Sequence, residues 1–339
     1  MNNQEIVEKI TSSILRARQG KTRYEMLYTD AGASVQPHEF LFFIKPEITM
    51  PSEQIDLKGI LTLVFAKLAL FNFHIRDIRT LAASYLEEHD IIARHYGVIN
   101  ALSRKPLEFL TNEAKEKFRS LYGKKPEQVS LLGGIEFLQH FPSFTPFTLD
   151  ELWQSHKAEK LAGGTYCARI LVEGKTIYLI NGFHPKQLIH FTEKGRSIIA
   201  FTLTSHIDWT TARNNFIGKT NPAEASKGSL RNEILNRMQE FGLQTVSSSQ
   251  NGFHLSAGPV EALVELIRYC SDYASGDIKV PEDFIFGRQL HTSFQLEEIR
   301  QICNNELVEY QGEKIRTFDL TEEKNSAEAL QMLKECTFQ

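Results

Sequence analysis

The sequence predicts an α+β fold in which helices pack on one face of an antiparallel sheet. A compact apolar run at residues 40–44 is typical of a buried strand, and so is the mostly apolar stretch 197–203, which includes Ser197 and Thr202. The helix that starts at Gly258-Pro259 instead carries apolar side chains at intervals of three and four, the spacing of an amphipathic helix, at Val260, Leu263, Val264 and Ile267. With residues 104–196 set aside, the order is strand, helix, strand, helix, strand, helix, loop, strand, helix. Alternation of this kind favours a single sheet covered by helices.

The first elements follow from local signals. A weak helical stripe over residues 4–18 ends at Gly20, and a connector leads on to Pro37. Residues 56–72 predict a helix that is apolar on almost every side, and residues 73–82 predict a second strand. Ser84 and Glu87 then form a capping box, which predicts a helix that carries Tyr96 on one face.

The pattern changes between residues 104 and 196, where amphipathic helices precede a hairpin of residues 165–172 and 176–180. This stretch therefore reads as a folded insertion. Beyond residue 272 we expect a helix at 296–306, a short strand at 307–310 and a last helix at 326–336. The expected parts are an N-terminal helix and connector (1–39), a main domain (40–103 with 197–271), the inserted α+β subdomain (104–196) and a C-terminal extension (272–339).

Composition excludes several classes of function. The 38 basic and 42 acidic residues give a net charge of only −4, so no global field favours nucleic acid or an anionic membrane. The longest apolar run, residues 60–73, is interrupted and too short to span a bilayer, and the first twenty residues lack a signal peptide. The four isolated cysteines argue against a zinc site or redox motif. We expect a cytoplasmic protein, in which any phosphate-bearing small molecule would have to be bound through locally placed lysines and arginines.

Two segments carry most of the chemical signal. The first runs from Gly218-Lys219-Thr220-Asn221-Pro222 to Gly228-Ser229-Leu230-Arg231, where the arginine can offer a planar fork to phosphate oxygens. The second is Asn251-Gly252-Phe253-His254, which places a histidine in a strand. Taken alone, such a histidine is as often structural as functional. The same tetrapeptide occurs at residues 181–184, but its flanking residues differ, and we treat the repeat as chance.

Together with Lys45-Pro46-Glu47 and His95-Tyr96-Gly97, these segments resemble the nucleoside diphosphate kinase family. The resemblance covers residues 40–103 and 197–271, under half of the chain. It implies a ferredoxin-like βαββαβ sandwich, interrupted here by the inserted subdomain. The implied activity is phosphoryl transfer through a phosphohistidine.

The resemblance also implies a role for each matching residue. His254 would be the nucleophile, oriented by Glu265, with Lys45 and Tyr96 directed at the transferring phosphate. The residues expected to bind the nucleotide are Thr220, Arg231, Asn251, Arg213 and Lys45, with Asn251 on a ribose hydroxyl. Arg213 lies five residues before Gly218 where the family has four, which predicts an extra residue in the local helix. The implied cofactors are Mg²⁺, held mainly by the nucleotide and not by a protein metal site, and ATP or another nucleoside triphosphate.

The chain departs from the family in several places. Leu255 replaces a glycine, Ala257 replaces an acidic residue, and the loop between Arg231 and Asn251 is longer. The insertion begins near the family's base-stacking phenylalanine, for which Phe109 is the candidate here. Two alternatives therefore stay open: a catalytically inactive nucleotide-binding sensor or scaffold, and a nucleotide-dependent transfer to an acceptor chosen by the insertion. The insertion and the C-terminal extension are the expected surfaces for an oligomer or a protein partner.

Overall fold

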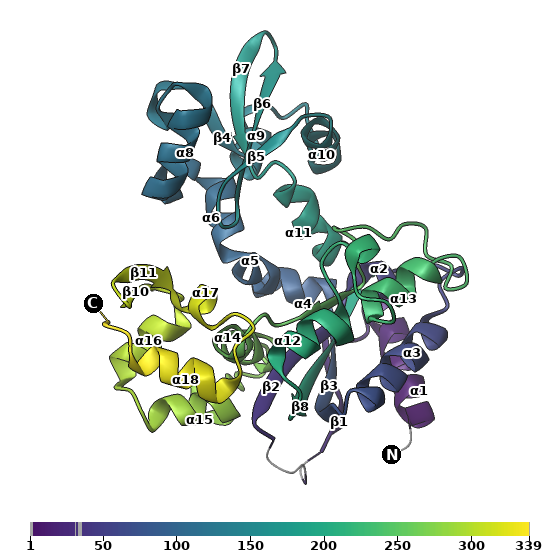
Figure 1. Cartoon of the computed structure of the whole chain (residues 1–339). Helices are drawn as coiled ribbons and strands as arrows, with labels where there is room; N and C mark the ends of the chain where they lie inside the picture. The colour runs from purple at the N-terminus through teal and green to yellow at the C-terminus, as the bar shows by residue number, and fades with distance from the viewer. Residues whose placement is uncertain (1–2, 31, 33–35, 339) are drawn as a thin grey trace. The chain divides into compact units, whose positions relative to one another are not determined.

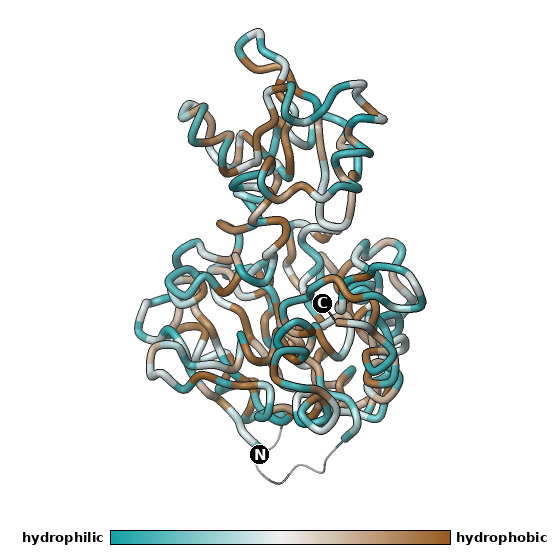
Figure 2. The backbone as a smooth tube through the Cα atoms, turned by 90° about the vertical axis from the view of Figure 1, so that its left-hand side faces the viewer, coloured by the Kyte–Doolittle hydropathy of each residue, from teal (hydrophilic) through white to brown (hydrophobic). Residues whose placement is uncertain are grey.

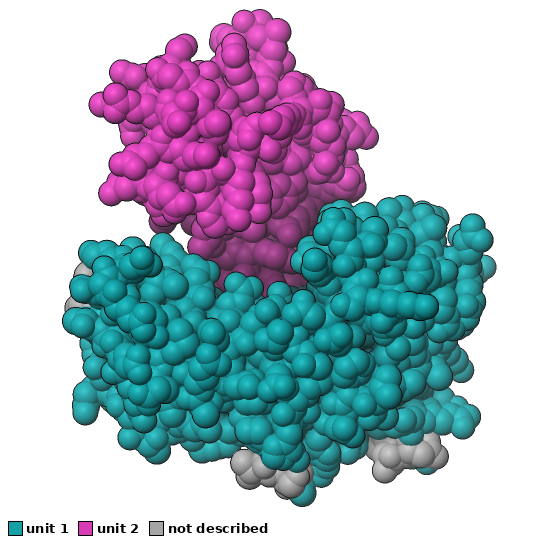
Figure 3. Space-filling model, viewed as in Figure 1, with its two compact units in different colours: residues 1–85, 194–339 teal, residues 86–193 magenta. Residues whose placement is uncertain are grey.

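The structure is a computed structural model that describes residues 3–30, 32 and 36–338 (Figure 1). It divides into two compact units, unit 1 with residues 1–85 and 194–339 and unit 2 with residues 86–193 (Figure 3). Part of the expected connector, residues 31 and 33–35, lies outside the described residues. Unit 2 begins well before residue 104, because the helix at Gly97–Arg104 packs on the helices of the insertion.

Unit 1 is built on a five-stranded sheet in which every pair of neighbours is antiparallel. Its strands, in spatial order, are β1 (Tyr24–Thr29), β3 (His74–Ala82), β8 (Ser197–Ser205), β2 (His38–Ile44) and β9 (Phe253–Leu255). Strand β1 falls in the stretch expected to be a connector. It is an edge strand in which Leu27 alone is buried, so it lacks the apolar run that marks a strand in the sequence.

Helices cover both faces of this sheet. On one face, Phe40 and Phe42 of β2 join a large apolar core with α1 (Asn3–Arg18) and α3 (Leu57–Leu70). Phe43 points to the opposite face, where its ring stacks on Tyr269 of α14 (Pro259–Cys270) with 5.4 Å between ring centroids. Apolar stretches accordingly run through the interior of the unit (Figure 2). The expectation of helices on one face is wrong, since β2 and β8 are buried along their whole length.

Short helices and one hairpin complete unit 1. These elements are α2 (Pro46–Thr49), the first half of α4 (Ala83–Glu88), which continues into unit 2, α12 (Trp209–Thr211), the π-helix η2 (Ala212–Ile217), the 3-10 helix η3 (Pro222–Glu224), α13 (Leu230–Asn236), the 3-10 helix η4 (Pro281–Asp283), α15 (Ile285–His291), α16 (Leu296–Cys303), β10 (Leu307–Tyr310), β11 (Glu313–Arg316), α17 (Thr317–Thr321) and α18 (Ser326–Lys334). The helix at 296–306, the strand at 307–310 and the helix at 326–336 are confirmed to within three residues at each end. Strands β2, β3, β8 and β9, with α3 and α13 between them, give the order strand, helix, strand, strand, helix, strand.

Unit 2 contains a four-stranded sheet. Its strands, in spatial order, are β4 (Leu131–Gly133), β7 (Lys175–Ile180), β6 (Thr165–Val172) and β5 (Ala158–Ala162). The predicted hairpin is confirmed as β6 and β7, with Glu173 and Gly174 both at positive φ, as its two-residue turn requires. The helices of unit 2 are α5 (Ile91–His95), α6 (Gly97–Arg104), α7 (Pro106–Phe109), α8 (Asn112–Tyr122), the 3-10 helix η1 (Pro126–Gln128), α9 (Gly134–His140), α10 (Pro146–Gln154) and α11 (His184–Thr192).

The single helix expected to run from Ser84 to Tyr96 is broken. Asp90 has a φ of 51°, in the left-handed region, and separates α4 from α5. Tyr96 then ends α5, so it belongs to unit 2. No helix among the described residues is long and apolar enough to cross a membrane.

Candidate functional site

His254 lies in the middle of the short strand β9, paired with Phe43 of β2. Its imidazole stacks on the Phe43 ring, with 4.5 Å between centroids and 21° between planes. Two residues earlier, Gly252 has a φ of 79°, and a Cβ there would come within 2.6 Å of Ile234. Only glycine fits this turn. Strand pairing and ring stacking therefore fix the histidine from two sides.

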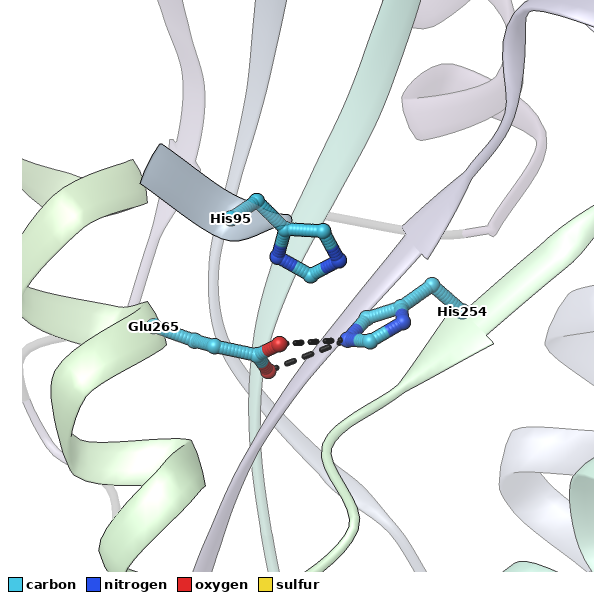
Figure 4. A group of neighbouring side chains, drawn as sticks. All are labelled: His95, His254 and Glu265. Atoms are coloured by element: carbon cyan, nitrogen blue, oxygen red, sulfur yellow. Dashed lines mark hydrogen bonds and ion pairs between the residues drawn. The ribbon is translucent and has the colours of Figure 1, made fainter. Parts of the chain in front are cut away.

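A carboxylate holds one ring nitrogen of His254. Nε2 lies 2.9 and 3.0 Å from the two oxygens of Glu265, which is buried on α14 (Figure 4). The Ser256 hydroxyl donates to the same carboxylate over 2.5 Å and accepts from the Leu41 amide. Such a partner favours the tautomer with its proton on Nε2. The lone pair is then on Nδ1, the nitrogen that faces away from the carboxylate.

The surroundings keep this ring uncharged near neutral pH. Burial lowers the pKa of His254 below its ordinary value of 6.5, and the charges of Lys45 and Arg213 lower it further. Glu265 opposes these effects but does not reverse them. A neutral imidazole can act as a nucleophile, whereas the imidazolium form cannot.

Lys45 follows β2 and is buried. Its Nζ donates to Oδ1 of Asn251 over 2.7 Å, and burial lowers its pKa to about 8, with Glu47 opposing and Arg231 assisting. The Asn251 amide in turn donates to the carbonyl oxygen of Thr220 over 3.0 Å. This chain of contacts ties the end of β2 to the loop after η2, on which the Thr220 side chain is exposed.

Arg231, in the first turn of α13, is also buried. Nη1 donates to the carbonyl of Gly218 over 2.8 Å, and Nη2 donates to the carbonyl of Phe253 over 2.9 Å. Gly218 has a φ of 87°, and a Cβ there would meet the Ser229 hydroxyl at 2.3 Å. The guanidinium thus fastens both ends of the loop to the strand that carries His254.

Arg213 lies in the π-helix η2. The amide of Gly218 donates to the carbonyl of Arg213, five residues earlier, over 3.1 Å. The extra residue expected in this helix is therefore present, and π-bulges of this kind are frequent at functional sites. Nη1 of Arg213 donates to the carbonyl of Leu255 over 2.9 Å, directly beside the histidine.

Within unit 1 the structure brings most of the predicted residues together. This group consists of His254, Glu265, Lys45, Asn251, Arg231 and Arg213. Thr220 joins it through its main chain. Tyr96 belongs to unit 2, where its ring lies 6.4 Å from that of His184. Phe109, the candidate for base stacking, is also in unit 2 and is half exposed on α7.

Three further residues of the site had no role in the sequence prediction. Phe43 supports the imidazole, Ser256 holds the Glu265 carboxylate, and the buried Glu47 accepts from the Gly252 amide over 2.8 Å. Phe43 and Glu47 lie two residues from Lys45, and Ser256 lies two residues from His254. Their closeness in sequence to predicted site residues was thus the signal that could have pointed to them, although it does not reveal what each side chain contacts.

The two carboxylates of the site, Glu265 and Glu47, do not fit a resident magnesium ion. Mg²⁺ needs several oxygen ligands in octahedral geometry. Glu265 is engaged by His254 and Ser256, while Glu47 accepts from the backbone of the glycine turn.

No protein-family model matches the chain, and no curated protein matches it in sequence. Among solved structures, the crystal structure of an NDP kinase from Pyrobaculum aerophilum covers 71% of this chain and 99% of that chain. The sequence identity is 14% and the TM-score is 0.34. A likeness of that size establishes neither a shared fold nor a shared activity.

Proposed function

We propose that this protein is a nucleoside diphosphate kinase-like phosphotransferase that forms a phosphohistidine on His254 from a nucleoside triphosphate. The observation that carries the proposal is the neutral imidazole, held at Nε2 by the buried Glu265 and flanked by the charges of Lys45 and Arg213. The order of β2, α3, β3, β8, α13 and β9 in an antiparallel sheet supports a ferredoxin-like βαββαβ arrangement as well.

In the first step, Nδ1 of His254 attacks the γ-phosphorus of the nucleotide. The N–P bond forms while the bond from that phosphorus to the bridging β–γ oxygen breaks, and a nucleoside diphosphate leaves. The ring then carries a positive charge, which the adjacent Glu265 carboxylate stabilises through the Nε2 proton. Lys45 and Arg213 offset the negative charge of the phosphate oxygens.

In the second step, a terminal phosphate oxygen of a nucleoside diphosphate attacks the phosphorus. The N–P bond breaks, its electron pair returns to Nδ1, and the ring becomes neutral again. Asn251 would bind a ribose hydroxyl, with Thr220 and Arg231 near the phosphates. Magnesium enters with the nucleotide and helps to neutralise its phosphates.

Incubation with γ-labelled ATP and magnesium tests this proposal. The label on the protein should be lost in acid and stable in base, as a phosphoramidate is, and His254→Ala should not be labelled. His254→Gln is the matched variant, because its amide still offers Glu265 a donor. An unlabelled wild type, or a labelled His254→Ala, would overturn the proposal.

One observation favours a second candidate, a nucleotide-binding protein without transfer. Arg231 donates to two main-chain carbonyls and Lys45 to Asn251, so both cations make structural contacts that support the loop. Nucleotide-dependent thermal stabilisation without labelling would favour this candidate. A labelled protein that fails to phosphorylate added nucleoside diphosphates, as judged by mass spectrometry of the products, would instead indicate a different acceptor.

A further inference from the structure

A segment of the C-terminal extension, residues 321–326, contacts the turn that follows His254. We refer to it as the C-terminal clasp. The amide of Glu323 donates to the carbonyl of Ala257 over 2.8 Å. A Cβ at Gly258 would lie 2.3 Å from the carbonyl oxygen of Thr321, so only glycine permits this approach. The clasp therefore packs directly against the chain three residues after the candidate nucleophile.

The clasp is anchored at its far end as well. Asn325 accepts from the amide of Trp209 over 3.1 Å and donates to Asp208 over 2.8 Å. The Ser326 hydroxyl lies 2.8 Å from Nδ1 of His38, at the start of β2. These contacts anchor the clasp to the start of α12 and to the start of β2.

The side chain that this arrangement brings to the site is Glu323. Its Oε1 lies 3.9 Å from Nε of Arg213, which is within ion-pair range but too long for a hydrogen bond. On its other side, Arg213 donates through Nη1 to the carbonyl of Leu255. Nε is buried and has no hydrogen-bond partner among the described residues. The guanidinium is therefore held between the backbone beside His254 and the carboxylate of the clasp.

We propose that Glu323 is a positioning residue that holds Arg213 in the orientation needed to bind nucleotide phosphate beside His254. The inference rests on the proposed function of this site. Arginine has a long, flexible stem whose ordering on binding costs free energy, so a guanidinium fixed in advance binds phosphate more tightly. Arg213 acts electrostatically on His254, so its orientation affects the site directly. Nothing in the family resemblance assigns a role to the C-terminal extension.

Glu323→Gln tests the proposal, with Glu322→Gln as its matched control. Both changes remove one negative charge, but Glu322 is exposed and has no ion pair with Arg213. We expect Glu323→Gln to raise KM for the triphosphate about twofold to fivefold, with kcat nearly unchanged, because a partly exposed ion pair at 3.9 Å contributes little energy. Glu322→Gln should match the wild type. An unchanged KM, or a lower one as expected if the carboxylate competed with phosphate, would overturn the proposal.

A double-variant cycle excludes a general effect of the clasp on folding. In an Arg213→Gln background, Glu323→Gln should raise KM no further, because the group that it positions is absent. An additive increase would contradict the proposal.

A readout that needs no nucleotide separates this inference from the proposed function. The ¹⁵N–¹H signal of Arg213 Nε should be sharp in the wild type and in Glu322→Gln, and broadened by exchange in Glu323→Gln. If the wild type forms no phosphohistidine, the proposed function fails, and this signal still decides the role of Glu323. An equally sharp signal in Glu323→Gln would overturn that role.

Discussion

The tetrapeptide Asn-Gly-Phe-His occurs once in each unit, and the two copies have different surroundings. In unit 1, His254 lies in a strand with its Nε2 against the carboxylate of Glu265. In unit 2, His184 opens α11 and is completely buried, with its ring nitrogens 3.0 and 3.2 Å from the side-chain amides of Gln187 and Asn100. One histidine has a charged partner and the other has two neutral ones.

The asparagines of the two copies differ as well. Asn181 has a φ of 49°, and its side chain accepts from the Tyr166 amide and donates to the Gly164 carbonyl, so it completes a turn. Asn251 accepts from Lys45 and thereby holds a cation beside the histidine. Burial lowers the pKa of both histidines. The comparison teaches that a buried, neutral imidazole is common to both copies, while the carboxylate and the lysine are particular to His254.

The largest expected effect separates the two histidines. His254→Ala should abolish labelling by γ-labelled ATP, whereas His184→Ala should retain it and lower the Tm. The loss of His184 leaves two amide groups without their partner, which costs about 1–3 kcal/mol. Labelling and thermal melts of both variants check the prediction, and loss of the label in a folded His184→Ala would contradict the distinction.

The next effect concerns the carboxylate. Glu265→Gln keeps a hydrogen-bonding group near Nε2 but removes the charge that stabilises the phosphorylated ring. We expect the rate of label formation to fall on the order of 10²-fold, the lower end of what a positioned acid or base contributes. Single-turnover labelling measures this rate. A rate within about twofold of the wild type would show that the partner's charge is not what distinguishes His254 from His184.

The pH dependence should differ between activity and stability. The folded pKa of His254 is lowered, so its neutral form persists as the pH falls through 6.5, and labelling should decline only below that value. On the alkaline side, kcat/KM should fall near pH 8 as Lys45 loses its proton. A plateau extending well above pH 8 would contradict the role of Lys45.

The pH dependence of folding stability follows from the same pKa shifts. Because both histidines have lowered pKa values when folded, the unfolded chain binds protons first as the pH falls. The contribution of the two neutral histidines to the free energy of unfolding is complete above pH 6.5. It is lost as the pH falls toward their folded pKa values. The variant His184→Ala should therefore lose less stability than the wild type on acidification below pH 6.5, while its labelling profile stays the same. Denaturant melts across this pH range measure the difference.

The smallest expected effect is that of giving His184 a carboxylate partner, which should produce no labelling. Gln187→Glu gives His184 a carboxylate partner, and we combine it with His254→Ala to remove the main label. We expect no label, because a carboxylate orients the ring but does not hold a phosphate. Label on His184 would show that a carboxylate partner alone is enough for phosphorylation of a buried histidine. The lysine beside His254 would then not distinguish the two histidines.

The sequence was informative where the physical signal is local. Apolar stretches mark β2 and β8. The residue count between Arg213 and Gly218, set against the spacing of the family that the chain resembles, predicted an extra residue, which the structure places in the π-helix η2. The edge strand β1 was not predicted, because it buries a single side chain and so has no apolar run. The break between α4 and α5 at Asp90 was not predicted either, because no proline or glycine marks it in the sequence. The packing of Glu323 against Arg213 joins positions far apart in the chain, and no periodicity or motif encodes such a contact.

Peptide mapping of the labelled protein tests the central claim most directly. Trypsin releases His254 in a peptide of residues 238–268 and His184 in a peptide of residues 176–186, so the two copies of the tetrapeptide separate. After digestion at alkaline pH, which preserves a phosphoramidate, the phosphate should be found on His254 in the first peptide. Phosphate on the second peptide, or on neither, would contradict the assignment of His254 as the nucleophile.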